Sequence, residues 1–68
     1  MRYRIEYLRE STEEDSVCTW QYAIGDSLSF AIEQARAGLG DARRSFGAHG
    51  FHIREIASGE ILVVEPET

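Results

Sequence analysis

The stretch Phe51–Glu65, FHIREIASGEILVVE, decides the fold, because it predicts a β-hairpin with apolar residues on both faces. Ser58 and Gly59 divide it, and a two-residue loop of this kind favours a tight primed turn. Pairing the strands outward from that loop places Ile53 opposite Val64. Directly opposed residues share a face, so this register also assigns every other side chain of the hairpin.

The second face of this hairpin needs a covering surface. The first face carries Phe51, Ile53, Leu62 and Val64, and the second carries Ile56, Ile61 and Val63. A small domain has one core, so the second apolar set is left for another molecule. We therefore predict an interface at Ile56, Ile61 and Val63, or at an exposed strand edge, for a second copy or another protein. A β-bulge near Arg54 and Glu55 would remove much of this argument, because it would rotate Ile56 onto the core face.

Two further strands are expected in the first third of the chain. Arg2–Leu8 alternates between apolar and polar residues, which is typical of a half-buried strand. The polar, acidic segment Arg9–Ser16 predicts a solvated hairpin loop. The strand Val17–Ile24 follows, and its residue types favour β structure. We expect the face that carries Trp20 to pack under a helix, with Cys18 as a small core residue.

A helix is predicted between the two hairpins. Gly25 ends the second strand, and Asp26 or Ser27 can cap the helix that follows. An apolar stripe at helical spacing comprises Leu28, Ala31, Ile32, Ala35, Leu39, Ala42 and Phe46. Gly38 and Gly40 lie within it and leave two short helices as an alternative, or mark close packing on the sheet. Gly47 is a suitable C-terminal stop.

These elements predict an α+β fold with the order β-β-α-β-β. One helix would cover one face of a four-stranded, mainly antiparallel sheet in a two-layer sandwich, with residues 1–68 as a single domain. The strand order stays open. The continuous apolar run Ile61–Val64 favours a central or doubly covered strand.

Composition narrows the classes of function. The chain has 68 residues and a net charge of −5, which argues against a general nucleic-acid binder. All seven basic residues are arginines, so chemistry that depends on lysine is excluded. Because Cys18 is the only cysteine and no leader or membrane-length apolar run is present, we expect a cytoplasmic protein with no membrane association. The bias towards Arg, Ala and Gly suggests a bacterial source.

Arginines gather on the polar face of the predicted helix. Arg36, Arg43 and Arg44 form a candidate patch for phosphate or an acidic partner. The alternative is a solvated face on which Glu33–Arg36 and Asp41–Arg44 pair at i,i+3 spacing. The sequence favours this second interpretation.

Other candidate sites are weaker. His49 and His52 have a His-x-x-His spacing, but a metal site needs further ligands. We expect His52 to lie opposite Glu65 instead, and we predict no catalytic residue, metal or cofactor. The aromatic residues Tyr3, Tyr7, Trp20 and Tyr22 could stack nucleic-acid bases on an open sheet. They are also the residues available to fill a small core, and we favour that interpretation.

The layout resembles small bacterial hairpin-helix-hairpin domains of unknown function. The resemblance rests on Trp20 in the second strand, the helical pattern AIEQAR over 31–36, and a late Gly followed by an apolar strand. In size and in its single helix the chain is also similar to the dodecins, small flavin-binding oligomers. Dodecins have one strand before the helix where this chain has a hairpin, so their flavin site is not carried over.

We accordingly expect a small non-enzymatic interaction module that forms a homodimer or higher oligomer through its sheet. The alternative is binding of nucleic acid or an acidic partner through Arg36, Arg43 and Arg44.

Overall fold

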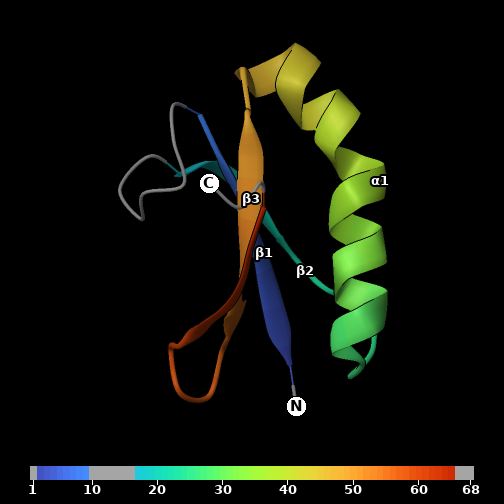
Figure 1. The fold of residues 1–68 in the computed structure, drawn as a ribbon, viewed down its shortest axis with the longest axis vertical. Coiled ribbons are helices and arrows are strands. Elements are labelled where there is room, and N and C mark those ends of the chain that lie inside the picture. Colours follow the sequence, from blue (N-terminus) through green and yellow to red (C-terminus); the bar gives the residue numbers. More distant parts are fainter. Residues whose placement is uncertain (1, 10–16, 66–68) are drawn as a thin grey trace.

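The computed structural model describes residues 2–9 and 17–65, and within them one helix lies against one face of a sheet (Figure 1). The elements are β1 (Tyr3–Leu8), β2 (Val17–Tyr22), α1 (Leu28–Phe46), β3 (Gly50–Glu55) and β4 (Ile61–Glu65). This order confirms the predicted β-β-α-β-β fold of class α+β. The predicted acidic loop falls, apart from Arg9, outside the described residues.

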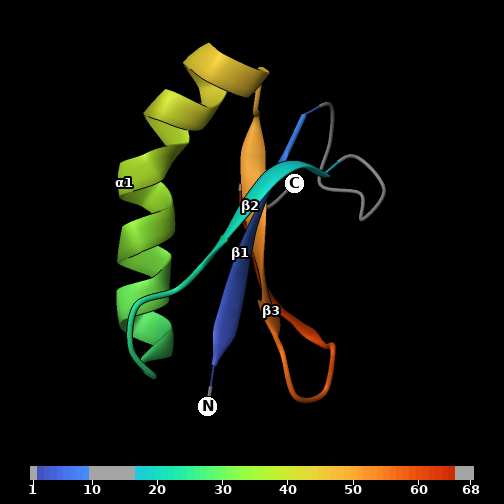
Figure 2. The ribbon, with the colours of Figure 1, turned by 180° about the vertical axis from the view of Figure 1, so that it is seen from behind.

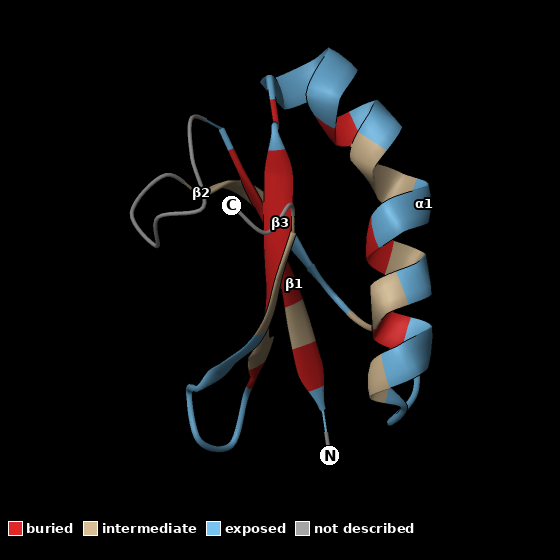
Figure 3. Ribbon diagram, viewed as in Figure 1, coloured by how far each residue is buried: buried red, intermediate tan, exposed pale blue. Residues whose placement is uncertain are grey.

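The four strands run antiparallel in the order β2-β1-β3-β4. β1 and β3 are therefore central, and both are mostly buried (Figure 3). Ile5 of β1 pairs with Ile53 of β3, and both residues are fully buried. The prediction that Ile61–Val64 is central was wrong, because β4 is an edge strand. A continuous apolar run indicates burial on both faces only where other layers cover both, and α1 covers one.

The core is built from large side chains of the sheet and small side chains of the helix. The helix buries only Ala31, Ala35 and Ala42. Against them pack the sheet residues Tyr3, Ile5, Tyr7, Phe51 and Ile53. Alanines let the helix approach the sheet closely, so the Tyr7 side chain reaches the helix backbone. The Tyr7 hydroxyl accordingly donates a hydrogen bond to the Ala35 carbonyl at 3.1 Å.

Both helix ends are capped as the sequence predicts. The Ser27 hydroxyl accepts a hydrogen bond from the Phe30 amide at 3.2 Å. Gly47 ends the helix with a φ of 75°, in the left-handed region that glycine adopts without strain. The helix runs unbroken through Gly38 and Gly40, so the alternative of two short helices is wrong.

The register of the last hairpin differs by one residue from the prediction. Ile53 lies opposite Val63 rather than Val64, and the ladder shifts between Ile53 and Arg54, where Arg54 pairs with Ile61. Two features combine, a wider turn and an irregularity in β4 that leaves Leu62 without a partner between Val63 and Ile61. The Glu55 amide bonds to the Glu60 carbonyl at 2.8 Å, which leaves residues 56–59 in the loop. A one-residue shift exchanges the two faces of a strand, so Val63 packs on the core.

Beyond Cys18, β2 also presents its faces the other way round from the prediction, because its ladder with β1 shifts between Tyr7 and Leu8. β2 runs along the outer side of β1 (Figure 2). Trp20 pairs with Glu6 on the face away from α1 and is 47% exposed. Gln21 lies on the helix side, where its amide donates to the Tyr7 hydroxyl at 3.2 Å. Gln34 of α1 makes two hydrogen bonds at the end of this strand: its amide donates to the Tyr22 carbonyl, and its side-chain oxygen accepts from the Ile24 amide. Because β2 is an edge strand, a polar side chain on its helix side stays near solvent.

Among the residues that the structure describes, no helix combines the length and apolar composition needed to cross a membrane.

Candidate functional site

The face of the sheet away from α1, here called the open face, carries two rows of side chains. Strand pairing gives one row as Tyr22, Arg4, Arg54 and Ile61. It gives the neighbouring row as Trp20, Glu6, His52 and Val64. Four charged or titratable residues thus occupy the middle two strands, with aromatic residues on β2 and aliphatic residues on β4.

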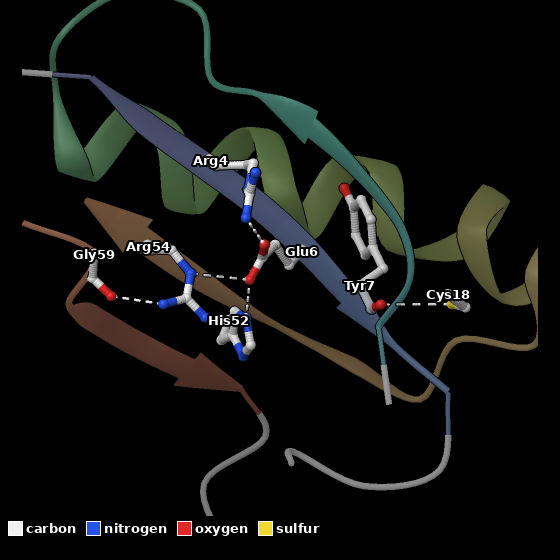
Figure 4. Close-up of polar contacts among 7 residues, drawn as sticks. All are labelled: Arg4, Glu6, Tyr7, Cys18, His52, Arg54 and Gly59. Atoms are coloured by element: carbon white, nitrogen blue, oxygen red, sulfur yellow. Dashed lines mark hydrogen bonds and ion pairs between the residues drawn. The ribbon is translucent and has the colours of Figure 1, made fainter. Parts of the chain in front are cut away.

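Glu6 is the centre of this polar group (Figure 4). Its carboxylate accepts hydrogen bonds from Arg4 at 2.5 Å, from Arg54 at 3.3 Å, and from the His52 Nε2 atom. Arg54 also donates to the Gly59 carbonyl at 2.6 Å, which ties the network to the β3–β4 turn. Glu6 is 4% exposed, so these donors replace the water that the carboxylate has lost.

The network sets the ionisation of Glu6. Burial, the largest single effect, disfavours its charge, but the hydrogen bonds and charges of His52 and Arg4 together outweigh it. The pKa of Glu6 therefore lies below its ordinary value of 4.5. Glu6 is a carboxylate at neutral pH, and it can only accept hydrogen bonds. The Nε2 atom of His52 must consequently carry a proton.

His52 is enclosed, which restricts its chemistry. Its side chain is fully buried, Nε2 is bound to Glu6, and Nδ1 is buried with no hydrogen-bond partner in the described part of the chain. Neither ring nitrogen reaches solvent, so the Glu6–His52 pair cannot exchange a proton with a substrate in this conformation. The pair links the two central strands, β1 and β3. The prediction that His52 lies opposite Glu65 was wrong, because His52 pairs with Val64.

An aromatic pair borders the network on β2. The rings of Trp20 and Tyr22 meet edge to face, with centroids 5.0 Å apart. The Arg4 guanidinium lies 5.1 Å from the Trp20 ring centroid, within the range of a cation–π contact. Trp20 is 47% and Tyr22 is 59% exposed, whereas Tyr3 and Tyr7 are buried in the core. The expectation that all four aromatic residues fill the core therefore holds for only two of them.

The predicted arginine patch does not form one cluster of unengaged cations. Arg36 donates two hydrogen bonds to Glu65, at 3.1 and 2.6 Å, rather than pairing with Glu33. Arg44 pairs with Asp41, as the solvated-face interpretation expected. Arg43 donates to the Ala48 carbonyl at 3.4 Å. Each guanidinium thus supports the fold, and Arg36 in particular ties α1 to β4.

The structure separates the three predicted interface residues. Ile56 and Ile61 are 43% and 37% exposed, and Leu62 beside them is 41% exposed. Val63 instead packs against the core. The register shift explains this division, because it turns Val63 towards α1 and leaves Ile61 on the face of Arg54.

The remaining candidates are not brought together. His49 is exposed, whereas His52 is buried. The residues that the structure describes contain no group of three or more metal-ligating side chains. Cys18 is half-buried, packs against the core as predicted, and its thiol donates to the Tyr7 carbonyl at 3.5 Å.

Sequence reasoning missed the Glu6 network because its members are distant in the chain. A signal was present, however. The alternation of β1 places Arg4 and Glu6 on one face, and the same alternation places His52 and Arg54 on one face of β3. Only the knowledge that β1 and β3 are neighbours, with Glu6 opposite His52, joins the two pairs.

No model of a protein family matches this chain, and no curated protein and no solved structure matches it either.

Proposed function

We propose that this chain is a small, non-enzymatic interaction module that self-associates through the β4 edge of its sheet. The observation that carries the proposal is an uncharged edge strand, Ile61–Val64, at which Ile61 and Leu62 are exposed. Edge strands can pair with a second chain unless something blunts them, and charged residues are a usual means. Within the run Ile61–Val64 this chain has none.

The charges favour a second copy of this chain as the partner that pairs with β4. In an antiparallel pairing of two β4 strands about Val63, Leu62 faces Val64 of the second copy and Glu65 faces Ile61. No carboxylate then lies directly opposite another carboxylate, although the chain carries a net charge of −5. Arg36 already balances Glu65 from the helix. The paired sheets would form one continuous sheet with both helices on the same side.

A small core supplies the reason for association. Helix α1 buries only three alanines, and a 68-residue chain hides a modest share of its surface when it folds. Covering Ile56, Ile61 and Leu62 in a dimer adds apolar burial at about 25 cal/mol per Å². Oligomerisation is a usual reinforcement of domains of this size.

The test is the association equilibrium of variants, measured by sedimentation. Leu62→Lys places a charge on the exposed edge and should shift the equilibrium to monomer, while circular dichroism stays unchanged. Ile24→Lys is the matched control, because Ile24 is 70% exposed and lies away from β4, and it should associate like the parent. Val63→Glu is unsuitable because Val63 packs on the core. Equal association of both lysine variants would overturn the proposal.

Three related expectations stay proposals alongside it. Residues 1–68 form one domain that works in the cytoplasm. A relationship to small bacterial domains of unknown function rests on the order of the elements alone. Binding of nucleic acid or an acidic partner through Arg36, Arg43 and Arg44 remains the alternative, with the partners of all three guanidiniums weighing against it.

A further inference from the structure

One surface of the open face is used neither by the core nor by the proposed β4 contact. It consists of Arg4, Trp20 and Tyr22, which we call the aromatic–arginine surface. The two rings are about half exposed, and the Arg4 side chain is 34% exposed. It lies on the β1–β2 half of the sheet, whereas β4 forms the opposite edge. Any ligand here would therefore bind independently of self-association.

Arg4 keeps capacity to bind an anion. A guanidinium has five N–H donors in a planar fork that matches a phosphate or carboxylate. Within the described residues, Glu6 takes one hydrogen bond from a terminal nitrogen of Arg4, and the Arg4 Nε atom is buried without a partner. The capacity to bind an anion therefore lies in the terminal N–H groups of the partly exposed guanidinium.

Trp20 and Tyr22 supply a stacking surface next to that charge. Exposed aromatic side chains on an open sheet stack on nucleic-acid bases, each contact contributing about 1–3 kcal/mol. An exposed tryptophan and tyrosine side by side leave apolar area in contact with water. Beside a partly exposed guanidinium they present the two chemistries of a nucleotide, an aromatic plane and an anion.

We propose that the aromatic–arginine surface binds a nucleoside monophosphate, with its base stacked on the exposed ring of Tyr22 beside Trp20 and its phosphate bound by Arg4. The net charge of −5 selects a single nucleotide over a strand, because each further phosphate of a strand would be repelled by the acidic remainder of the chain.

The only tryptophan of the chain, Trp20, reports binding directly. Adenosine 5′-monophosphate should quench its fluorescence in a saturable way at constant ionic strength. Adenosine alone and inorganic phosphate alone should each bind at least about tenfold more weakly, because each keeps one of the two contacts. A short oligoadenylate should bind no more tightly per nucleotide than the monophosphate.

Variants separate binding from folding. Tyr22→Ala removes a 59% exposed ring and should weaken binding about tenfold with the fold intact. Arg4→Gln should abolish the advantage of the monophosphate over adenosine. Phe30→Ala is the matched control, because Phe30 is a 49% exposed aromatic residue on the helix, and it should bind like the parent.

Three outcomes would overturn the proposal. The first is no saturable quenching up to about 10 mM monophosphate, which excludes binding stronger than about 3 kcal/mol. The second is equal loss of binding in Tyr22→Ala and Phe30→Ala. The third is binding of the oligoadenylate without binding of the monophosphate, which would make a nucleic-acid strand the occupant.

Discussion

Gly38 of α1 and Tyr7 of β1 are so close that a methyl group on Gly38 would overlap the Tyr7 hydroxyl. The same hydroxyl donates to the Ala35 carbonyl and accepts a hydrogen bond from Gln21. One tyrosine thus joins the central strand, the helix and the edge strand β2, and the missing side chain at position 38 makes room for it.

Gly38→Ala should destabilise the protein although alanine is the better helix former. Overpacking of a well-filled core costs about 1–3 kcal/mol, which exceeds the gain in helix propensity of up to about 1 kcal/mol. Gly40→Ala is the control, because nothing lies within 4 Å of a Cβ at that position, and it should stabilise by about 0.5–1 kcal/mol. Urea denaturation gives both values. Similar effects of the two substitutions would contradict the close contact at Gly38.

Side-chain patterns in the sequence predict the elements of this fold but not the order of the strands in the sheet. The period of two in β1 and the helical stripe from Leu28 identify the elements, and the caps at Ser27 and Gly47 bound the helix. The strand order is different in kind. The strand order depends on which strands have a hydrogen-bonded neighbour on both sides. The apolar run Ile61–Val64 does not show that β4 has a neighbour on one side only.

The errors in facing have a common physical origin. Alternation shows which residues share a face, but not which face meets the helix. In β2 the polar Gln21 takes the helix side because the buried Tyr7 hydroxyl provides it with a hydrogen-bond partner, and Trp20 packs on Arg4 instead. In β4 the extra residue Leu62, which has no partner between Val63 and Ile61, exchanges the faces of Val63 and Val64. The buried Glu6–His52 contact depends on strand pairing, so it could not be predicted before the strand order was known.

Glu6→Gln should destabilise the fold by about 3 kcal/mol, the scale for removing one partner of a buried charge network. The neutral amide cannot balance the positive charges of Arg4 and Arg54, and it accepts weaker hydrogen bonds than a carboxylate. Glu60→Gln makes the same chemical change at an exposed position and should alter the free energy of unfolding by less than about 0.5 kcal/mol. Chemical denaturation at pH 7 compares them, and equal stability of the two variants would refute a stabilising role for the network.

Acid should weaken the protein through Glu6. The pKa of Glu6 is lower in the folded chain than its ordinary 4.5, so the unfolded state binds the proton first. The stability that this carboxylate contributes is present above about pH 4.5 and is lost as the pH falls through the folded value. The difference in unfolding free energy between the parent and Glu6→Gln should therefore shrink below pH 4.5. A difference that stays constant down to pH 2 would contradict this assignment.

Alkali should weaken the protein through Tyr7. Burial raises the pKa of Tyr7 above its ordinary value of 10, and the hydrogen bond from Gln21 lowers it by less. The unfolded state then ionises first, so the contribution of Tyr7 is complete below pH 10 and is lost as the pH rises towards the folded value. Thermal unfolding between pH 8 and 11 should show a steeper loss for the parent than for Tyr7→Phe. Parallel curves would count against the shift.

The central claim, self-association through β4, is tested most directly by the absolute mass in solution. Light scattering on a sizing column should give twice the chain mass of 7.7 kDa at high concentration and approach 7.7 kDa on dilution. A mass of 7.7 kDa at every concentration up to the solubility limit would contradict the account, because the exposed β4 edge would then not pair with a second copy.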